Sequence, residues 1–303
     1  MRFAAIALSM FLWILCGSPV AAAETPVIVA AGDISCDNRF DLMRLFGGCK
    51  SAQTAVLVAT IHPAAVLALG DVQYPDGSLE SYKRAYDTTW GRFKAITYPA
   101  IGNHEYADGR DRDAKGYFAY FGDRAGEPGK GWYSFDLTSW HLIALNGNCQ
   151  EAGGCDHDSP QERWLRDDLA AHRGRCTLAF MHQPRFSSGG HGGNEAYVPF
   201  WDDLYQGGAA IVLSGHDHDY ERFEPQRPDG SLDPAAGIVQ FVVGTGGKSH
   251  NVFVRHAAHS VIFNQRDFGV LVLTLGEQTY DWRFERIPDG ETLDSGSGRC
   301  PGH

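Results

Sequence analysis

The chain has 303 residues and a formal net charge of −11, with 37 acidic residues against 26 Lys and Arg. This acidic balance and the lack of any basic run argue against a nucleic-acid backbone as the main partner, because such binding needs clustered Lys and Arg. A small phosphorylated substrate remains compatible with the charge, since bound metal ions supply local positive charge.

The N-terminus has the features of a secretory signal peptide, which we assign to residues 1–23. A basic second residue precedes an apolar run over residues 3–15, and a Gly-Ser-Pro break leads to three alanines. A retained membrane anchor is the alternative, but the apolar run is short for a bilayer span. We therefore predict a secreted or periplasmic protein with no membrane span in the mature chain. The sequence from residue 24 to residue 303 contains no internal repeat, low-complexity tract or long linker, so we predict a single domain there.

The cysteines agree with export. Six remain after removal of the signal peptide, and an even number in an oxidising compartment suits disulfides. The pairs closest along the chain, and the pair that then remains, are Cys36–Cys49, Cys149–Cys155 and Cys176–Cys300. Other connectivities stay open from the sequence.

Short apolar runs rich in β-branched residues predict strands buried on both faces. The four clearest runs are 27–31, 65–69, 176–181 and 209–213, and further strands are expected at 132–136, 140–145, 238–243 and 270–275. The C-terminal part therefore contains more strand than helix.

Two segments between these strands have helical features. Residues 78–93 place large apolar side chains at three- and four-residue intervals, which is one face of a helix. Ser159-Pro160-Gln161-Glu162 is a capping box that opens a second helix, and Gly174 marks its end. The alternation of strands and helices predicts an α/β or α+β layered fold with helices outside the sheets.

Four of the predicted strands end directly at residue types that bind metals. The motifs are Gly32-Asp33, Gly70-Asp71 followed by Tyr74, His182, and Gly215-His216-Asp217-His218, and a fifth segment leads into Gly102-Asn103-His104-Glu105. Polar residues beyond the carboxyl ends of strands meet in one crevice of an open α/β sheet, and the glycines suit sharp turns and close backbone approach. Each motif alone is a weak signal. Together, in this order, they predict one shared site.

This series resembles the five-block signature of the calcineurin-like metallophosphoesterases. The tyrosine three residues after Asp71 makes it similar to the purple acid phosphatase branch, as does Asp219-Tyr220-Glu221-Arg222. The resemblance spans roughly residues 32–222 and implies a four-layer sandwich of two mixed β-sheets flanked by helices. One departure is Ser35, which stands where many purple acid phosphatases have glycine.

The resemblance also implies which residues bind metal and substrate. Around a first metal, ferric iron in that branch, it places Asp33, Asp71, Tyr74 and His218. Around a second metal, which is iron, zinc or manganese, it places the bridging Asp71 with Asn103, His182 and His216. His104 matches the histidine that contacts phosphate and helps to protonate the leaving group, and His191 falls where another substrate-side histidine is found.

The residue types support this interpretation through their own chemistry. Carboxylate, imidazole and amide ligands suit hard to borderline cations, and two cations about 3.5–4 Å apart clamp both oxygens of a phosphoryl displacement. A phenolate at Tyr74 requires a strongly Lewis-acidic ion, which favours Fe(III) there. We expect a hydroxide held by the metals to attack phosphorus in line while His104 protonates the departing alkoxide.

The sequence therefore predicts an exported dinuclear phosphoesterase, acid phosphatase-like, that hydrolyses small phosphate monoesters. A phosphodiesterase acting on nucleotides or lipid head groups stays open, because the motifs do not define the pocket walls. A secreted metal-binding protein without turnover is the alternative from another class, and His104 argues against it. Residues 242–249 come close to a P-loop, but Val242 stands where that motif needs glycine, so we interpret them as a glycine-rich turn.

Overall fold

The computed structural model describes residues 25–37, 48–107, 113–250 and 255–302. The predicted signal peptide lies outside these residues, so it stays a prediction. Within the described ranges, no helix combines the length and the apolar character needed to cross a membrane.

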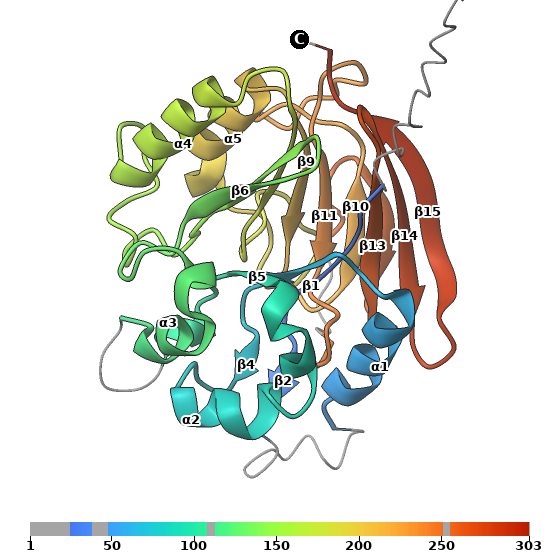
Figure 1. Ribbon diagram of the computed structural model, residues 1–303. Helices are drawn as coiled ribbons and strands as arrows, with labels where there is room; N and C mark the ends of the chain where they lie inside the picture. Colours follow the sequence, from blue (N-terminus) through green and yellow to red (C-terminus); the bar gives the residue numbers. More distant parts are fainter. Residues whose placement is uncertain (1–24, 38–47, 108–112, 251–254, 303) are drawn as a thin grey trace, which may run out of the picture.

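Two large mixed sheets form the centre of the described structure (Figure 1). The first has the strand order β15 (Glu291–Arg299), β14 (Thr279–Arg286), β13 (Gly269–Leu275), β1 (Val27–Ala31), β3 (Ala65–Leu69) and β5 (Thr97–Ala100). The second has the order β12 (Ser260–Asn264), β10 (Tyr220–Phe223), β11 (Val239–Val243), β9 (Ala209–Ser214), β8 (Cys176–Phe180), β7 (Trp140–Ala144) and β6 (Tyr133–Leu137). All eight strands predicted from the sequence are present, with ends shifted by no more than one residue.

Residue alternation along the strands explains why the two sheets stack face to face. In β8, Leu178 and Phe180 belong to the large core shared with the first sheet, whereas Ala179 and the next residue after the strand, Met181, pack in a second core on the opposite face. Neighbouring side chains of a strand point to opposite faces, so a run that is apolar throughout buries both of them. The predicted two-sided burial of this strand is confirmed.

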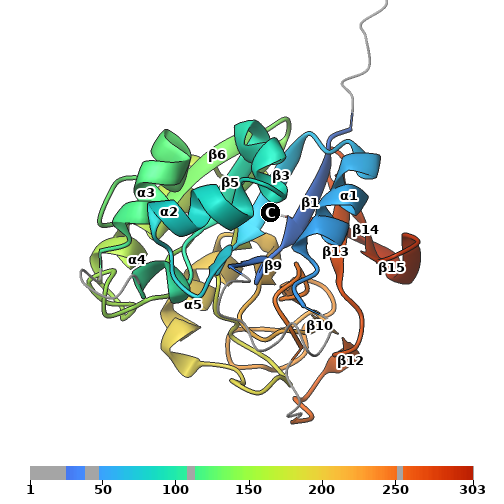
Figure 2. The ribbon, with the colours of Figure 1, turned by 90° about the horizontal axis from the view of Figure 1, so that it is seen from below.

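Helices cover the outer faces and complete four layers. On the second sheet, α4 (Pro160–Ala171) and α5 (Val198–Gln206) contribute Leu165, Leu169 and Trp201 to the second core. On the first sheet, α1 (Ser51–Ile61) contacts β13. The view from below separates α1, beside β1 and β13, from α5 on the far side of the molecule (Figure 2). The predicted sandwich of two mixed sheets flanked by helices is confirmed.

The helix predicted over residues 78–93 is wrong as a continuous helix. The segment divides into α2 (Leu79–Ser81), a π-helical turn (Tyr82–Tyr86) and a 3-10 turn (Trp90–Ile96). The backbone N–H of Tyr86 donates to the side chain of Gln73 over 3.1 Å, while Asp87 N donates to Tyr82 O over 2.9 Å. A side chain that inserts into the helical hydrogen-bond ladder breaks it. The predicted apolar face survives, because Tyr82, Tyr86 and Trp90 are all fully buried.

The capping box at the start of α4 forms. Ser159 Oγ accepts the backbone N–H of Glu162 over 3.3 Å, and Pro160 occupies the first turn. In a capping box the glutamate side chain also accepts the backbone N–H of the capping serine. Here Glu162 Oε2 instead accepts the backbone N–H of the preceding residue, Asp158, over 2.9 Å. The helix ends at Ala171, three residues before the left-handed Gly174.

The three disulfides have the pairing that the cysteine spacing favours: Cys36–Cys49, Cys149–Cys155 and Cys176–Cys300. The third bond has a topological consequence. Cys176 begins β8 in the second sheet and Cys300 follows β15 in the first, so this bond ties the two sheets together covalently.

A buried histidine joins the hairpin of β6 and β7 to α4. His141 is 1% exposed, and its Nδ1 lies 2.9 Å from Asp136 Oδ1 while its Nε2 lies 2.7 Å from Asp168 Oδ2. An ionised carboxylate only accepts hydrogen bonds, so both contacts are made as hydrogen bonds when the ring is an imidazolium. Burial alone lowers the pKa of His141, but the two carboxylates outweigh it and raise the pKa above its usual value. His172 stacks on the ring at 3.7 Å, and Arg175 lies 3.4 Å from Asp136.

The raised pKa of His141 predicts a stability that depends on pH. The ion pairs contribute fully below the unfolded-state pKa of about 6.5, and their contribution is lost as the pH rises through the folded-state value. Replacing the residue by His141→Asn should flatten this loss, as measured by urea unfolding from pH 6 to 9. His157→Ala, which removes an exposed histidine, should keep the wild-type slope. Parallel curves for wild type and His141→Asn would contradict the ion-pair account.

Candidate metal centre

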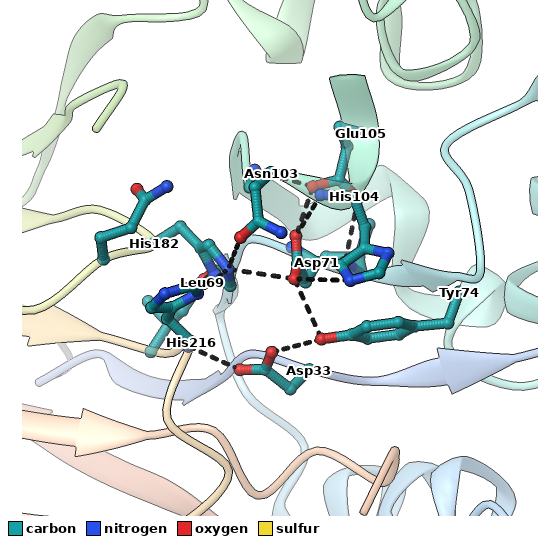
Figure 3. A network of polar contacts seen from close by, with 12 residues as sticks. Asp33, Leu69, Asp71, Tyr74, Asn103, His104, Glu105, His182 and His216 are labelled. Carbon is teal, nitrogen blue, oxygen red and sulfur yellow. Dashed lines mark hydrogen bonds and ion pairs between the residues drawn. The ribbon is translucent and has the colours of Figure 1, made fainter. Parts of the chain in front are cut away.

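The carboxyl ends of strands from both sheets meet at one edge of the sandwich. The loops after β1, β3 and β5 in the first sheet carry Asp33, Asp71 and Asn103, and those after β8 and β9 in the second carry His182 and His216. Figure 3 shows these side chains pointing toward one another. The crevice expected from the strand-end motifs is therefore formed by two sheets rather than by one.

The backbone at these loops adopts a conformation that few side chains tolerate. Asp33, Asp71 and His216 have φ of 56°, 45° and 71°. Non-glycine residues in this left-handed region cost of order 1–3 kcal/mol each and cluster at functional sites. Hydrogen bonds between loops hold the conformation: Asp33 N donates to Gly70 O over 3.1 Å, and His216 N donates to Asp33 Oδ2 over 2.8 Å.

Two glycines permit the close approach of these loops. A Cβ atom on Gly102 would lie 2.2 Å from Asp71 Oδ1, and one on Gly70 would lie 2.6 Å from the Cβ of His182. Neither position has room for a side chain. The sequence motifs therefore contain these glycines for steric reasons, as expected.

The first group of convergent atoms surrounds the Tyr74 hydroxyl. Tyr74 Oη lies 2.5 Å from Asp33 Oδ1, 3.0 Å from Asp71 Oδ2 and 3.2 Å from His218 Nε2. His218 Nε2 also lies 3.2 Å from Asp33 Oδ1. Four side chains predicted to share one metal thus place their ligand atoms together.

The second group surrounds His182. Its Nε2 lies 3.1 Å from Asp71 Oδ2, 3.2 Å from Asn103 Oδ1 and 3.2 Å from His216 Nδ1. Its other ring nitrogen faces Leu69 O at 2.8 Å, which orients the ring (Figure 3). Asp71 Oδ2 contacts both groups, so one carboxylate oxygen is shared between them.

The chemistry of these atoms fits cations. A proton on His182 Nε2 can satisfy only one of its three neighbours, and those neighbours are acceptors or imidazole nitrogens. The separations of 3.1–3.2 Å match the edges of a coordination polyhedron, which are roughly 3.0–3.4 Å for metal–ligand distances of about 2.1 Å. Without a cation, several buried lone pairs would face one another unsatisfied.

The electrostatics of the groups agree with cation binding. Burial and the neighbouring His182 and His191 lower the pKa of His216 to about 4, so its ring offers a lone pair at neutral pH. Burial opposes ionisation of Asp71, but His182 and His104 hold the pKa of this carboxyl well below its usual range. Burial lowers the pKa of His182, but the neighbouring Asp71 carboxylate outweighs it and raises this pKa to about 10. A metal must therefore displace a proton from His182.

Tyr74 behaves differently. Burial, Asp33 and Asp71 raise the pKa of its hydroxyl well above the usual value. The phenol thus stays protonated beside two carboxylates unless a cation replaces its proton. This requirement gives Tyr74 a preference for a highly charged ion.

Glu105 holds the two loops of the first sheet in register, a role that the sequence did not reveal. Its carboxylate accepts the backbone N–H of Asp71 at 2.9 Å, of Val72 at 3.0 Å and of Gly102 at 2.7 Å, and the hydroxyl of Tyr82 at 3.0 Å. Four donors on one buried carboxylate fix the loops that carry Asp71 and Asn103 (Figure 3).

His104 and His191 lie at the margin of the two groups. His104 Nδ1 is 2.7 Å from Pro75 O, and Nε2 is 3.9 Å from Asp71 Oδ2. His191 Nδ1 is 3.0 Å from Asp217 Oδ1, and its ring centroid is 4.2 Å from that of His216. Each ring is anchored through Nδ1 to the protein, which leaves Nε2 available on a partly exposed side chain.

The glycine-rich turn borders the site. Gly246 N donates to Gly32 O, and Lys248 N donates to Asp33 O, both over 2.9 Å. At its end Ser249 Oγ lies 2.8 Å from His218 Nδ1 and orients that ring. No sequence motif points to Ser249, because only the tertiary fold brings residues 218 and 249 together.

Asp136, His141 and His172 form a second group of metal-binding residue types among the described residues. The nitrogens of His141 are already occupied by two carboxylates, and its ring is stacked on that of His172. Stacked rings direct their nitrogen lone pairs side by side rather than toward one point. This group is therefore an ion-pair cluster.

Comparison with known families agrees with the geometry. The family model described as "Calcineurin-like phosphoesterase" matches residues 26–220. The chain belongs to this family. Its matched region includes every residue of the two convergent groups.

Individual relatives extend the comparison. Purple acid phosphatase 18 of Arabidopsis thaliana is 29% identical over 174 residues, which cover 54% of this chain and 38% of that protein. Purple acid phosphatase 15 of the same plant is 29% identical over 230 residues, or 64% of this chain and 42% of that protein. The chain thus matches less than half the length of these relatives.

A solved structure shows the same fold. Purple acid phosphatase PPD1 from yellow lupin seeds superposes with a TM-score of 0.71 and 19% identity, covering 91% of this chain and 54% of that one. GAP50, described as the anchor in the inner membrane complex of Plasmodium, superposes with a TM-score of 0.64 and 13% identity, covering 91% of this chain and 89% of that one. Proteins with different described roles share this fold, so function must be argued from the site.

Proposed function

We propose that the chain is an exported phosphoesterase that hydrolyses phosphate monoesters with a pair of metal ions. The observation that carries this proposal is the shared Asp71 Oδ2, which contacts an acceptor-rich group on each side. One carboxylate oxygen between two cation-binding groups is the arrangement that a dinuclear centre needs. Membership of the phosphoesterase family and the similarity to purple acid phosphatases support it.

In this proposal Asp33, Asp71, Tyr74 and His218 hold one metal, and Asp71, Asn103, His182 and His216 hold the other. When bound, such metals supply Lewis acidity and positive charge that stabilise the oxygens of a phosphoryl transfer. The protein contributes the spacing of the groups, because each group takes residues from both sheets.

The chain's own proton donor is His104. Its Nδ1 faces Pro75 O, which holds the ring and its tautomer, while Nε2 faces the site. The ring also lies 4.3 Å from that of Tyr74, which restricts its rotation. We propose that His104 Nε2 carries the proton given to the leaving alkoxide, and that His191 Nε2 contacts the phosphate from the other side.

We further propose Fe(III) at the Tyr74 group, with iron, zinc or manganese at the other. The support is the raised pKa of Tyr74, since a phenolate beside two carboxylates needs a strongly charged cation. Export is proposed from the signal-like N-terminus and is supported by the three disulfides, which persist in oxidising compartments.

A diesterase with the same site is the second candidate. A panel of aryl phosphate monoesters and diesters, tested on metal-loaded protein, separates the two functions. We expect monoesters to be cleaved faster. A clear preference for diesters would replace the proposed substrate class, and failure to cleave either would favour a metal-binding protein without turnover.

Removing the proposed proton donor should separate catalysis from metal binding. His104→Ala should keep two metals per chain, because His104 is not among the proposed ligands, but should lose roughly 10²–10⁴-fold in kcat. Metal analysis and steady-state kinetics on the same samples test this. His157→Ala serves as the control for loss of an exposed histidine. Unchanged kcat in His104→Ala would refute the role assigned to it.

The Fe(III) assignment predicts a coloured protein. A phenolate bound to ferric iron absorbs visible light by charge transfer, so concentrated protein should be purple or pink. Tyr74→Phe removes the phenolate and should abolish the band. Colourless, active wild type that contains only zinc or manganese would exclude ferric iron without affecting the phosphoesterase proposal.

A further inference from the structure

Asp217 stands between two proposed metal ligands, yet its side chain serves another loop. His216 and His218 contact the two proposed metal groups, whereas the carboxylate of Asp217 contacts the loop that carries His191. Asp217 is fully buried. Its Oδ1 accepts the backbone N–H of His191 over 2.8 Å and lies 3.0 Å from His191 Nδ1, and its Oδ2 accepts the hydroxyl of Ser187.

The loop after β8 is folded around this carboxylate. A Cβ atom on Gly189 would lie 2.2 Å from Asp217 Cγ, so the loop passes directly over the carboxyl group. Gly189 N donates to Ser187 Oγ over 2.9 Å, which closes the turn around it. Only glycine fits at this point of contact.

Glu221 anchors the same loop at a second point. Its carboxylate accepts the backbone N–H of Ser188 over 2.8 Å and the hydroxyl of that residue over 2.5 Å. None of these bonds reaches His191. The two acids therefore have separable roles: Glu221 holds the loop, whereas Asp217 holds both the backbone and the ring of His191.

The ring of His191 needs such support. Its side chain is 52% exposed, and an exposed histidine otherwise samples several rotamers. Binding of Nδ1 to Asp217 fixes the ring against His216, at 4.2 Å between centroids, and leaves Nε2 free. A group that contacts a reacting phosphate must be held within a fraction of an ångström.

We propose that Asp217 is a positioning residue that fixes His191 beside the metal pair for contact with the substrate phosphate. The inference rests on the proposed function, since it assigns His191 to the phosphate. It goes beyond that function in naming the residue that makes the contact possible. Asp217 touches neither the substrate nor a metal in this role.

A double-mutant cycle tests the coupling. In the wild-type background, Asp217→Ala should lower kcat/KM for an aryl phosphate and weaken binding of inorganic phosphate by roughly 10- to 100-fold. In the His191→Ala background, the same change should have less than about a twofold effect, because the group it positions is gone. Asp217→Asn, which retains one acceptor oxygen, should recover part of the loss. Asp167→Ala, an exposed site on α4, is the matched control.

Calorimetry with inorganic phosphate on metal-loaded protein separates this inference from the proposed function. Coupled losses in phosphate affinity would support the inference even if no ester were cleaved. Equal losses in both backgrounds would overturn it while leaving the phosphoesterase activity in place. Loss of bound metal in Asp217→Ala would also overturn the inference, because it would show that Asp217 holds the metal-binding histidines rather than His191. Wild type that neither cleaves esters nor binds phosphate would overturn both.

Discussion

The structure depends on a concentration of groups that cannot satisfy one another. Two carboxylates, an amide oxygen, a phenol and three imidazoles meet within hydrogen-bond distance at the edge of a sandwich, with far fewer protons than lone pairs. Buried acceptors without partners are costly, and the left-handed backbone at Asp33, Asp71 and His216 adds strain. A fold that gathers such groups needs a rigid frame around them, and cations are the partners that relieve the excess of lone pairs.

The frame is built from features that do not touch the site's centre. Glu105 ties two loops of the first sheet through backbone donors, Ser249 orients His218, and Asp217 holds the loop of His191. Glu105 and Asp217 lie within the strand-end motifs and Ser249 ends the glycine-rich turn, yet all three side chains are used for support. Preorganised supporting contacts of this kind keep reactive groups within the tolerance that catalysis requires.

Much of this arrangement was predictable from the sequence, and the reason is physical. Two-sided apolar runs define buried strands, and polar residues at their ends must lie at a sheet edge, so Asp33, Asp71, His182 and His216 were placed correctly. The supporting roles of Glu105, Asp217 and Ser249 were not predictable, because they depend on which loops become neighbours in space. The break in the helix predicted over 78–93 has the same cause, because the side chain of Gln73 enters the helical hydrogen-bond ladder from the short strand β4 (Gln73–Tyr74).

The alternation of side-chain direction along β8 affects the spacing of the two groups of metal-binding residues. Phe180, the last residue of β8, faces the core between the sheets, and His182 lies two residues later in the loop that follows. Each metal-binding group takes residues from both sheets. The separation of its ligand atoms therefore depends on the volume of the side chains that pack between the sheets. Replacing the buried ring of Phe180 by a smaller side chain would let the two sheets pack closer together. An apolar substitution, which removes no polar atom, would then change the distances between the metal-binding side chains.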